Sequence, residues 1–302
     1  MNATISSGRP GASVSKAHLA YGILVSASIL ICLKRLTALT AYALGHDSSS
    51  QILLIPFVAA YLIWLARKRV FAVIDPSPLP GAAVMLTGGL LFWLAGSASW
   101  PLPGNENLCL SAFAMFLIWV GAFVLCYGLA ATRAAVFPLL FLLLMIPLPD
   151  PVLDWVTFLL QRGSTEITYL IFKAVGVPVF RQGFFLTVPG ITIEVAKECS
   201  SIRSSIALVI TCLIAAHFYL RTWWKALLFV LISLPLSVVK NGIRIATLTL
   251  LSLYVDPGFL HGDLHRDGGF VFFFLALLML WPVLVGLERS DRQHTLHTVA
   301  HT

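Results

Sequence analysis

The sequence predicts an all-α polytopic membrane protein of about eight transmembrane helices, with a short helix and β-hairpin inserted before Cys199. Three observations lead to this fold class. Of the 302 residues, 59% are hydrophobic and 11% are charged, whereas about a quarter of a soluble domain is charged. The mean hydropathy is +0.91. Apolar runs approach the roughly 20 residues that a spanning helix needs, and they occupy most of the chain.

The apolar runs are expected to form one transmembrane domain over residues 19–287. It follows a polar tail, 1–18, and precedes a second polar tail, 288–302. Several runs are short and extend into their flanks. The predicted spans are 19–33, 52–65, 81–98, 108–129, 134–148, 205–220, 226–239 and 269–287.

The basic residues predict the orientation, because connections on the cytoplasmic side are enriched in Lys and Arg. "ARKR" at 66–69 is the densest basic cluster between two spans. Alternating from there puts both termini in the cytoplasm and residues 149–204 outside, with Lys34 and Arg35 as exceptions. The net charge of +7 thus follows from topology. With no Lys/Arg face carrying interleaved aromatic residues, nucleic acid is not an expected partner.

The outside connection, 149–204, is the one sizeable polar segment between spans. "PLPDP" at 147–151 ends the preceding helix. Residues 152–175 have helical apolar spacing with charges interspersed, which is typical of a helix at the membrane interface. Residues 177–196 are rich in β-branched and aromatic side chains, and turn signals at Gly183 and Pro189-Gly190 predict a small hairpin.

Residues 241–255 are apolar enough to be a further span. Arg244, Gly242 and the short approach from the previous span favour a half-helix or re-entrant segment that lines a polar cavity. With that topology the connection 256–268 lies outside, on the same side as Cys199.

Three reactive side chains then meet at the outer membrane edge: Cys199, Arg244 and His265. A thiol is a nucleophile as its thiolate, which a helix N-terminus and a nearby cation such as Arg203 stabilise. Histidine can accept and return a proton near neutral pH. Arginine can stabilise an oxyanion or a carboxylate. The three residue types support acyl transfer through a thioester.

Each of these residues also has a plainer interpretation. Cys199 could be a small packing residue at a helix start, Arg244 an interface residue, and His265 a loop histidine. "HGDLH" at 261–265 contains possible metal ligands, yet further ligands at a fixed spacing are missing, so neither a metal nor another cofactor is expected. The residues interpreted as packing cysteines are Cys32, Cys109, Cys126 and Cys212, and the solvated tail histidines are His294, His297 and His301.

At the same residues the sequence resembles the exosortase/archaeosortase family of membrane cysteine transpeptidases. "ECSSIRS" at 198–204 is similar to the family's cysteine motif, and "NGIR" at 241–244 fits its N-x-x-R element. His265 is followed by Gly269 and the aromatic Phe270, as in the family's histidine motif.

The resemblance extends upstream of these motifs. Residues 47–64 look like the family's first conserved loop and span, and 137–149 like its Pro-bounded helix. The chain departs from the family pattern at Ser201, where glycine is usual, and at Gln51, where histidine is usual. Phe270 replaces the commoner tryptophan.

The resemblance implies a set of roles. Cys199 would be the nucleophile, Arg244 the electrostatic partner and His265 the proton shuttle. The supporting residues would be Glu198, Arg203, Asn241 and Gly269.

The implied activity is cleavage of exported proteins at a C-terminal sorting signal of the PEP-CTERM type, which combines a recognition motif, a transmembrane helix and a basic tail. The product would be transferred to a lipid or glycan acceptor or released by water. The implied location is the inner (plasma) membrane, with the active site facing the extracytoplasmic side, in a setting of exopolysaccharide production.

Two alternatives come from other classes. A transporter or a polysaccharide assembly factor without catalytic activity would have charges near the midplane of several spans and internal repeats. Here the polar residues gather towards one face and no repeat is visible. A zinc-dependent intramembrane protease would need HExxH or an equivalent ligand set, which the sequence lacks.

Overall fold

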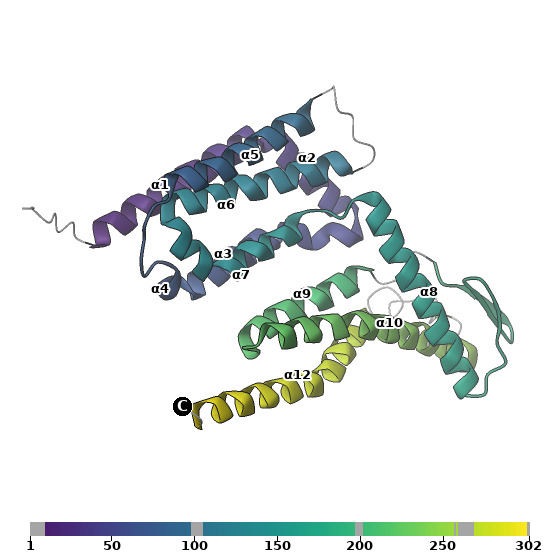
Figure 1. The fold of residues 1–302 in the computed structure, drawn as a ribbon. Helices are drawn as coiled ribbons and strands as arrows, with labels where there is room; N and C mark the ends of the chain where they lie inside the picture. Colours follow the sequence, from purple (N-terminus) through teal and green to yellow (C-terminus); the bar gives the residue numbers. More distant parts are fainter. Residues whose placement is uncertain (1–9, 98–104, 197–201, 257, 259–268, 301–302) are drawn as a thin grey trace, which may run out of the picture. The chain divides into compact units, whose positions relative to one another are not determined.

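The computed structural model of the chain describes residues 10–97, 105–196, 202–256, 258 and 269–300 (Figure 1). These residues form two compact units, Met1–Val152 and Leu153–Thr302. The first unit is helical, whereas the second also contains a small sheet. The prediction of one transmembrane domain over 19–287 stays a prediction.

The first unit is built around α6, which packs on α5, α1, α2 and α4. Its elements are α1 (Pro10–Ile31), α2 (Leu33–Gly45), η1 (Asp47–Leu53), α3 (Ile55–Leu65), α4 (Arg67–Val70), α5 (Pro78–Gly96), α6 (Glu106–Ala134), α7 (Val136–Phe141) and η2 (Leu142–Met145).

Glycines allow α5 and α6 to approach closely. A Cβ on Gly81 would lie 2.4 Å from the backbone nitrogen of Leu125, and one on Gly121 would lie 2.5 Å from that of Met85. Small residues at such a contact let two backbones meet, which is how helices associate in a membrane without a hydrophobic driving force.

α6 is interrupted at Gly128, where φ is +86°. A Cβ there would lie 1.7 Å from the carbonyl oxygen of Asp75, so this position requires glycine for both conformation and space. The interruption lets the connection before α5 dock, because the backbone N–H of Asp75 donates to the carbonyl of Tyr127 at 3.3 Å.

In its described residues, the second unit combines four long helices with a three-stranded sheet (Figure 1). α9, α10 and α12 pack on one another around a shared apolar core. The elements are α8 (Asp150–Ala174), β1 (Phe180–Gln182), β2 (Phe185–Val188), β3 (Ile191–Glu194), α9 (Ile202–Tyr219), α10 (Trp223–Tyr254) and α12 (Gly269–Ala300).

The strands form an antiparallel meander in the order β1-β2-β3. The predicted hairpin is therefore one strand short. Both turn signals are used, because Gly183 and Gly190 adopt positive φ between successive strands. One face of the sheet packs on α8 and α10, where Leu186 and Val195 lie in a core with Phe172.

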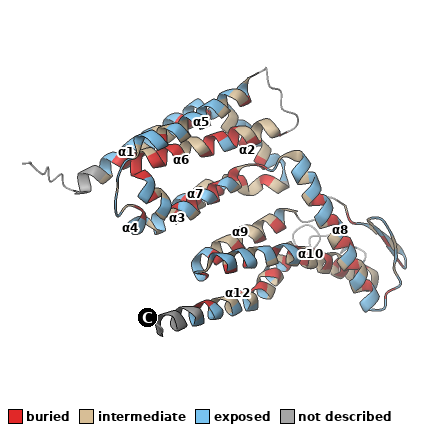
Figure 2. Ribbon diagram, in the orientation of Figure 1, coloured by how far each residue is buried: buried red, intermediate tan, exposed pale blue. Residues whose placement is uncertain are grey.

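The membrane fold class is confirmed. Seven helices in the described part of the chain are long and apolar enough to span a bilayer, or up to eight if the pair Val136–Met145 and Asp150–Ala174 is counted as one bent span. Figure 2 shows that exposed residues recur along these helices, and many of them have large apolar side chains. Leu79, Phe57 and Phe270 are each more than 70% exposed, which suits lipid and not water.

The predicted break before residue 241 is wrong. α10 runs from Trp223 to Tyr254 as one helix through Pro235. At about 1.5 Å per residue its 32 residues extend roughly 48 Å, which exceeds the hydrocarbon core of a bilayer. A glycine and an arginine inside an apolar run indicated a half-helix, but Gly242 serves close packing against α8 instead.

Candidate active site

The structure describes some of the predicted site residues. Arg203, Asn241, Arg244 and Gly269 are described. Cys199, Glu198 and His265 lie outside the described residues, as do Ser201 and the possible metal ligands His261 and Asp263. The triad therefore stays a prediction, and the described residues nearest to the cysteine in sequence are Ala196 and Ile202.

Arg244 lies on α10, and its guanidinium Nε is buried. Lys240 lies four residues earlier, on the same face of the helix, and is 1% exposed. Asn241 is fully buried beside it. An apolar helix that carries three such side chains within five residues has a polar patch at this level, which is typical of a functional site in a membrane protein.

Asn241 and Gly242 join α10 to α8. The amide Nδ2 of Asn241 donates to the hydroxyl of Ser164 at 2.9 Å, and the Thr168 hydroxyl donates to the carbonyl of Gly242 at 3.3 Å. A Cβ on Gly242 would lie 2.4 Å from Cγ2 of Ile167. The asparagine and the glycine of the "NGIR" motif thus serve the crossing of two helices beside Arg244.

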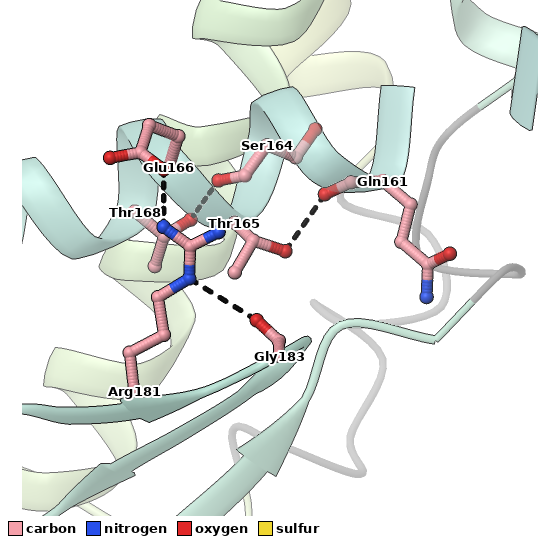
Figure 3. Close-up of polar contacts among 7 residues, drawn as sticks. All are labelled: Gln161, Ser164, Thr165, Glu166, Thr168, Arg181 and Gly183. Carbon is pink, nitrogen blue, oxygen red and sulfur yellow. Dashed lines mark hydrogen bonds and ion pairs between the residues drawn. The ribbon is translucent and has the colours of Figure 1, made fainter. Parts of the chain in front are cut away.

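The buried face of α8 is polar, and Figure 3 shows part of it. Thr165 and Thr168 donate to carbonyls one turn earlier in their own helix, so their polar groups are satisfied locally. On the other side of the helix, Glu166 forms an ion pair with Arg181 of β1, and the Arg181 Nε also donates to the Gly183 carbonyl at 3.2 Å (Figure 3). α8 therefore holds the sheet as well as α10.

Gln161 contacts the chain shortly before Cys199, which the sequence did not reveal. Its Nε2 donates to the backbone carbonyl of Val195 at 2.5 Å, and the glutamine is buried. Val195 precedes Cys199 by four residues. A glutamine on an amphipathic helix carries no sign of this contact, because its partner lies 34 residues further along the chain.

Lys240 was also missed, although a signal existed. Its ammonium Nζ donates to the hydroxyl of Ser204 in the first turn of α9, at 2.6 Å. Ser204 follows Cys199 by five residues. A lysine in the middle of an apolar run is expensive in a membrane and therefore marks a functional candidate by default.

Two predicted supporting residues lie at the starts of helices. Arg203 is exposed at the start of α9. Gly269 begins α12, and a Cβ there would meet no atom of the described residues within 4 Å. Packing against the described residues therefore does not explain the glycine at position 269.

The structure describes the four remaining cysteines, whereas the possible metal ligands at 261–265 lie outside the described residues. Cys32, Cys109, Cys126 and Cys212 are free and buried, which confirms their interpretation as packing residues. Among the described residues, no three His, Cys, Asp or Glu side chains gather to hold a metal ion.

Comparisons with known proteins identify one family. The model of the transmembrane exosortase (EpsH) family matches residues 38–282. No curated protein and no solved structure matches the chain. Because the family match covers most of the chain and includes the segments around both Cys199 and Arg244, the chain belongs to the transmembrane exosortase family.

Proposed function

We propose that this exosortase is a membrane cysteine transpeptidase that cleaves exported proteins at a C-terminal sorting signal. Family membership supports a transpeptidase- or protease-like function in the broad sense. The contact that carries the proposal is the hydrogen bond of 2.6 Å between Lys240 and Ser204. It ties the helix turn next to Arg244 to a residue five positions after Cys199.

In the proposed reaction the Cys199 thiolate attacks the carbonyl carbon of the scissile peptide bond. The Arg244 guanidinium stabilises the negative charge that develops on the carbonyl oxygen. His265 donates a proton to the leaving amine, the C–N bond breaks, and the tail departs with a new amino terminus. The exported part remains on the sulfur as a thioester.

The second step resolves the thioester. An amine or hydroxyl of a lipid or glycan acceptor, or water, attacks the same carbon. His265 takes the proton of the attacking group, and the C–S bond breaks to return the thiolate. The enzyme ends the cycle unchanged, and the exported protein carries either the acceptor or a free carboxylate.

The proposed substrate suits a membrane enzyme. A sorting signal with a spanning helix and a basic tail holds the scissile bond at the outer membrane surface, because the tail stays in the cytoplasm. Diffusion within the bilayer then brings bond and thiol together at a high effective concentration. We accordingly place the active site on the extracytoplasmic side of the inner (plasma) membrane.

The direct test co-expresses a protein bearing a motif, a span and a basic tail with the wild type, Cys199→Ala or Cys212→Ala. Cys212 is a buried packing cysteine in α9 and provides a matched control. We expect the wild type and Cys212→Ala to shorten the substrate, and Cys199→Ala to leave it intact. Normal shortening by Cys199→Ala would overturn catalysis by this thiol.

A second measurement tests the sidedness of the site. A cysteine introduced at position 261 should react in intact cells with a membrane-impermeant thiol reagent added from outside. Labelling from the cytoplasmic side alone would separate His265 from an outward-facing Cys199 and remove the proposed proton shuttle.

A further inference from the structure

We propose that Gln161 and Lys240 are positioning residues, which hold the two ends of the segment that carries the thiol nucleophile. This inference rests on the proposed function of Cys199. We use the name cysteine segment for residues 196–203, which lie between the two anchored residues Val195 and Ser204.

The anchor before the cysteine segment is Val195. Its backbone N–H donates to the Phe184 carbonyl at 3.0 Å, and its carbonyl accepts from Gln161 at 2.5 Å. The Val195 side chain is 1% exposed and packs in the core between the sheet and the helices. Backbone and side chain are therefore both fixed at the point where the chain leaves the sheet.

The anchor after the cysteine segment is Ser204, which receives the hydrogen bond from the Lys240 ammonium. Burying a cation is costly unless an anion or several hydrogen bonds compensate it. Among the described residues, the hydrogen-bond partner of the Lys240 ammonium is this neutral hydroxyl. An aliphatic side chain of similar length would avoid the cost, so the lysine is poorly explained by stability alone.

Both anchors lead back to the helix that carries Arg244. Lys240 is one turn from Arg244 on α10. Gln161 lies on α8, which is bonded to α10 through Ser164 and Asn241. Hydrogen bonds thus connect both ends of the cysteine segment to the same part of α10, directly at Ser204 and through α8 at Val195. Catalytic groups must be held within a fraction of an ångström of their productive geometry, and a second layer of contacts supplies that precision.

The test measures kcat and KM for substrate shortening by purified enzyme in detergent. The variants are Gln161→Met and Lys240→Met, which keep the side-chain length and remove the donor. We expect kcat to fall roughly 10- to 100-fold with KM nearly unchanged, because misplacement of a reacting group by about 1 Å costs this much. Lys240→Arg keeps a cationic donor and should restore most of the rate.

Thr165→Val is the matched control on α8, because Thr165 is fully buried on the same helix and bonds within it. We expect it to retain the wild-type rate. A cycle of Lys240→Met, Ser204→Ala and the double variant should be strongly non-additive, because both changes remove the same hydrogen bond.

The outcomes separate this inference from the function on which it rests. If Cys199→Ala is inactive while Gln161→Met and Lys240→Met work at the wild-type rate, positioning is wrong and the transpeptidase stands. If Cys199→Ala is active, the function itself is wrong and the inference falls with it. Losses that follow only the loss of folded protein, without rescue by Lys240→Arg, would also overturn positioning.

Discussion

Two buried lysines on α10 differ in the side chains that their ammonium groups contact. Lys225, in the first turn, is 2% exposed and forms an ion pair of 3.0 Å with Asp291 of α12. Lys240, 15 residues or roughly 22 Å further along the helix, is 1% exposed and donates to the hydroxyl of Ser204. The two lysines share residue type, burial and helix, and their partners alone distinguish them.

The Lys225 end is fully compensated. Asp291 also accepts from the backbone N–H groups of Arg221 and Thr222, at 2.8 and 3.2 Å, and from the Thr222 hydroxyl at 2.5 Å. Ser290 accepts a further bond from Lys225 at 3.1 Å. Every charge in this cluster has an opposite charge or several hydrogen bonds, so it fastens α12 to the connection between α9 and α10.

The buried polar groups near Lys240 have fewer hydrogen-bond partners among the described residues. The buried hydroxyls of Ser205 and Ser237, on α9 and α10, have no hydrogen-bond partner among the described residues. Natural proteins keep few such groups, and those that they keep need an explanation. The difference teaches that burial alone does not define the role of a lysine: the charge of Lys225 is neutralised by a carboxylate, whereas Lys240, among the described residues, donates to a neutral hydroxyl, which supports the positioning role proposed for it.

The largest effect is expected when the ion pair between Lys225 and Asp291 is broken. Asp291→Asn leaves the Lys225 ammonium buried without a counter-charge, so the free energy of unfolding should fall by about 3–5 kcal/mol. Denaturant unfolding in detergent measures this. Adding Lys225→Met to Asp291→Asn should recover much of the lost free energy of unfolding. If Asp291→Asn left the free energy of unfolding unchanged, the comparison would be wrong.

At the Lys240 end, the closest packing contact is at Gly242. Gly242→Ala places a Cβ against Ile167 and should lower the free energy of unfolding by about 1–3 kcal/mol through overpacking. Gly269→Ala is the control, because that site has open space and alanine is a better helix former. Equal losses of thermal stability in both variants would show that the α8–α10 contact is looser than described.

The sharpest test of the comparison is whether one substitution, at Lys240, raises or lowers the free energy of unfolding. Lys240→Met removes a poorly compensated buried charge, so the free energy of unfolding should stay level or rise by about 1 kcal/mol. Thermal unfolding measured alongside kcat should then show a stable protein whose kcat is lowered roughly 10- to 100-fold. A clear loss of stability would make Lys240 a structural residue like Lys225.

The smallest effect comes from an exposed pair beside the compensated cluster. Arg292 and Glu288 form an ion pair of 2.5 Å one turn apart on α12, and the arginine side chain is 75% exposed. Arg292→Gln should change the free energy of unfolding by less than about 0.5 kcal/mol, because water already screens the charges. A loss comparable to that of Asp291→Asn would mean that burial does not set the strength of these pairs.

Much of the fold could be predicted from composition and local pattern. The long apolar runs became helices, and "PLPDP" separates η2 from α8 as expected. α8 was predicted as a helix from residue 152 and begins at Asp150. The error was the break before residue 241, because a glycine in an apolar helix can mark either a break or a close contact, and the local sequence is the same in both cases.

The sequence by itself determined the membrane class, the approximate spans and the family motifs, because hydropathy and motif spacing are local properties. The tertiary structure decided which polar side chains meet. Gln161 reaches Val195 and Lys240 reaches Ser204 across gaps of 34 and 36 residues. Contacts at such separations depend on how helices cross and on which faces they bury, and no local pattern specifies either one.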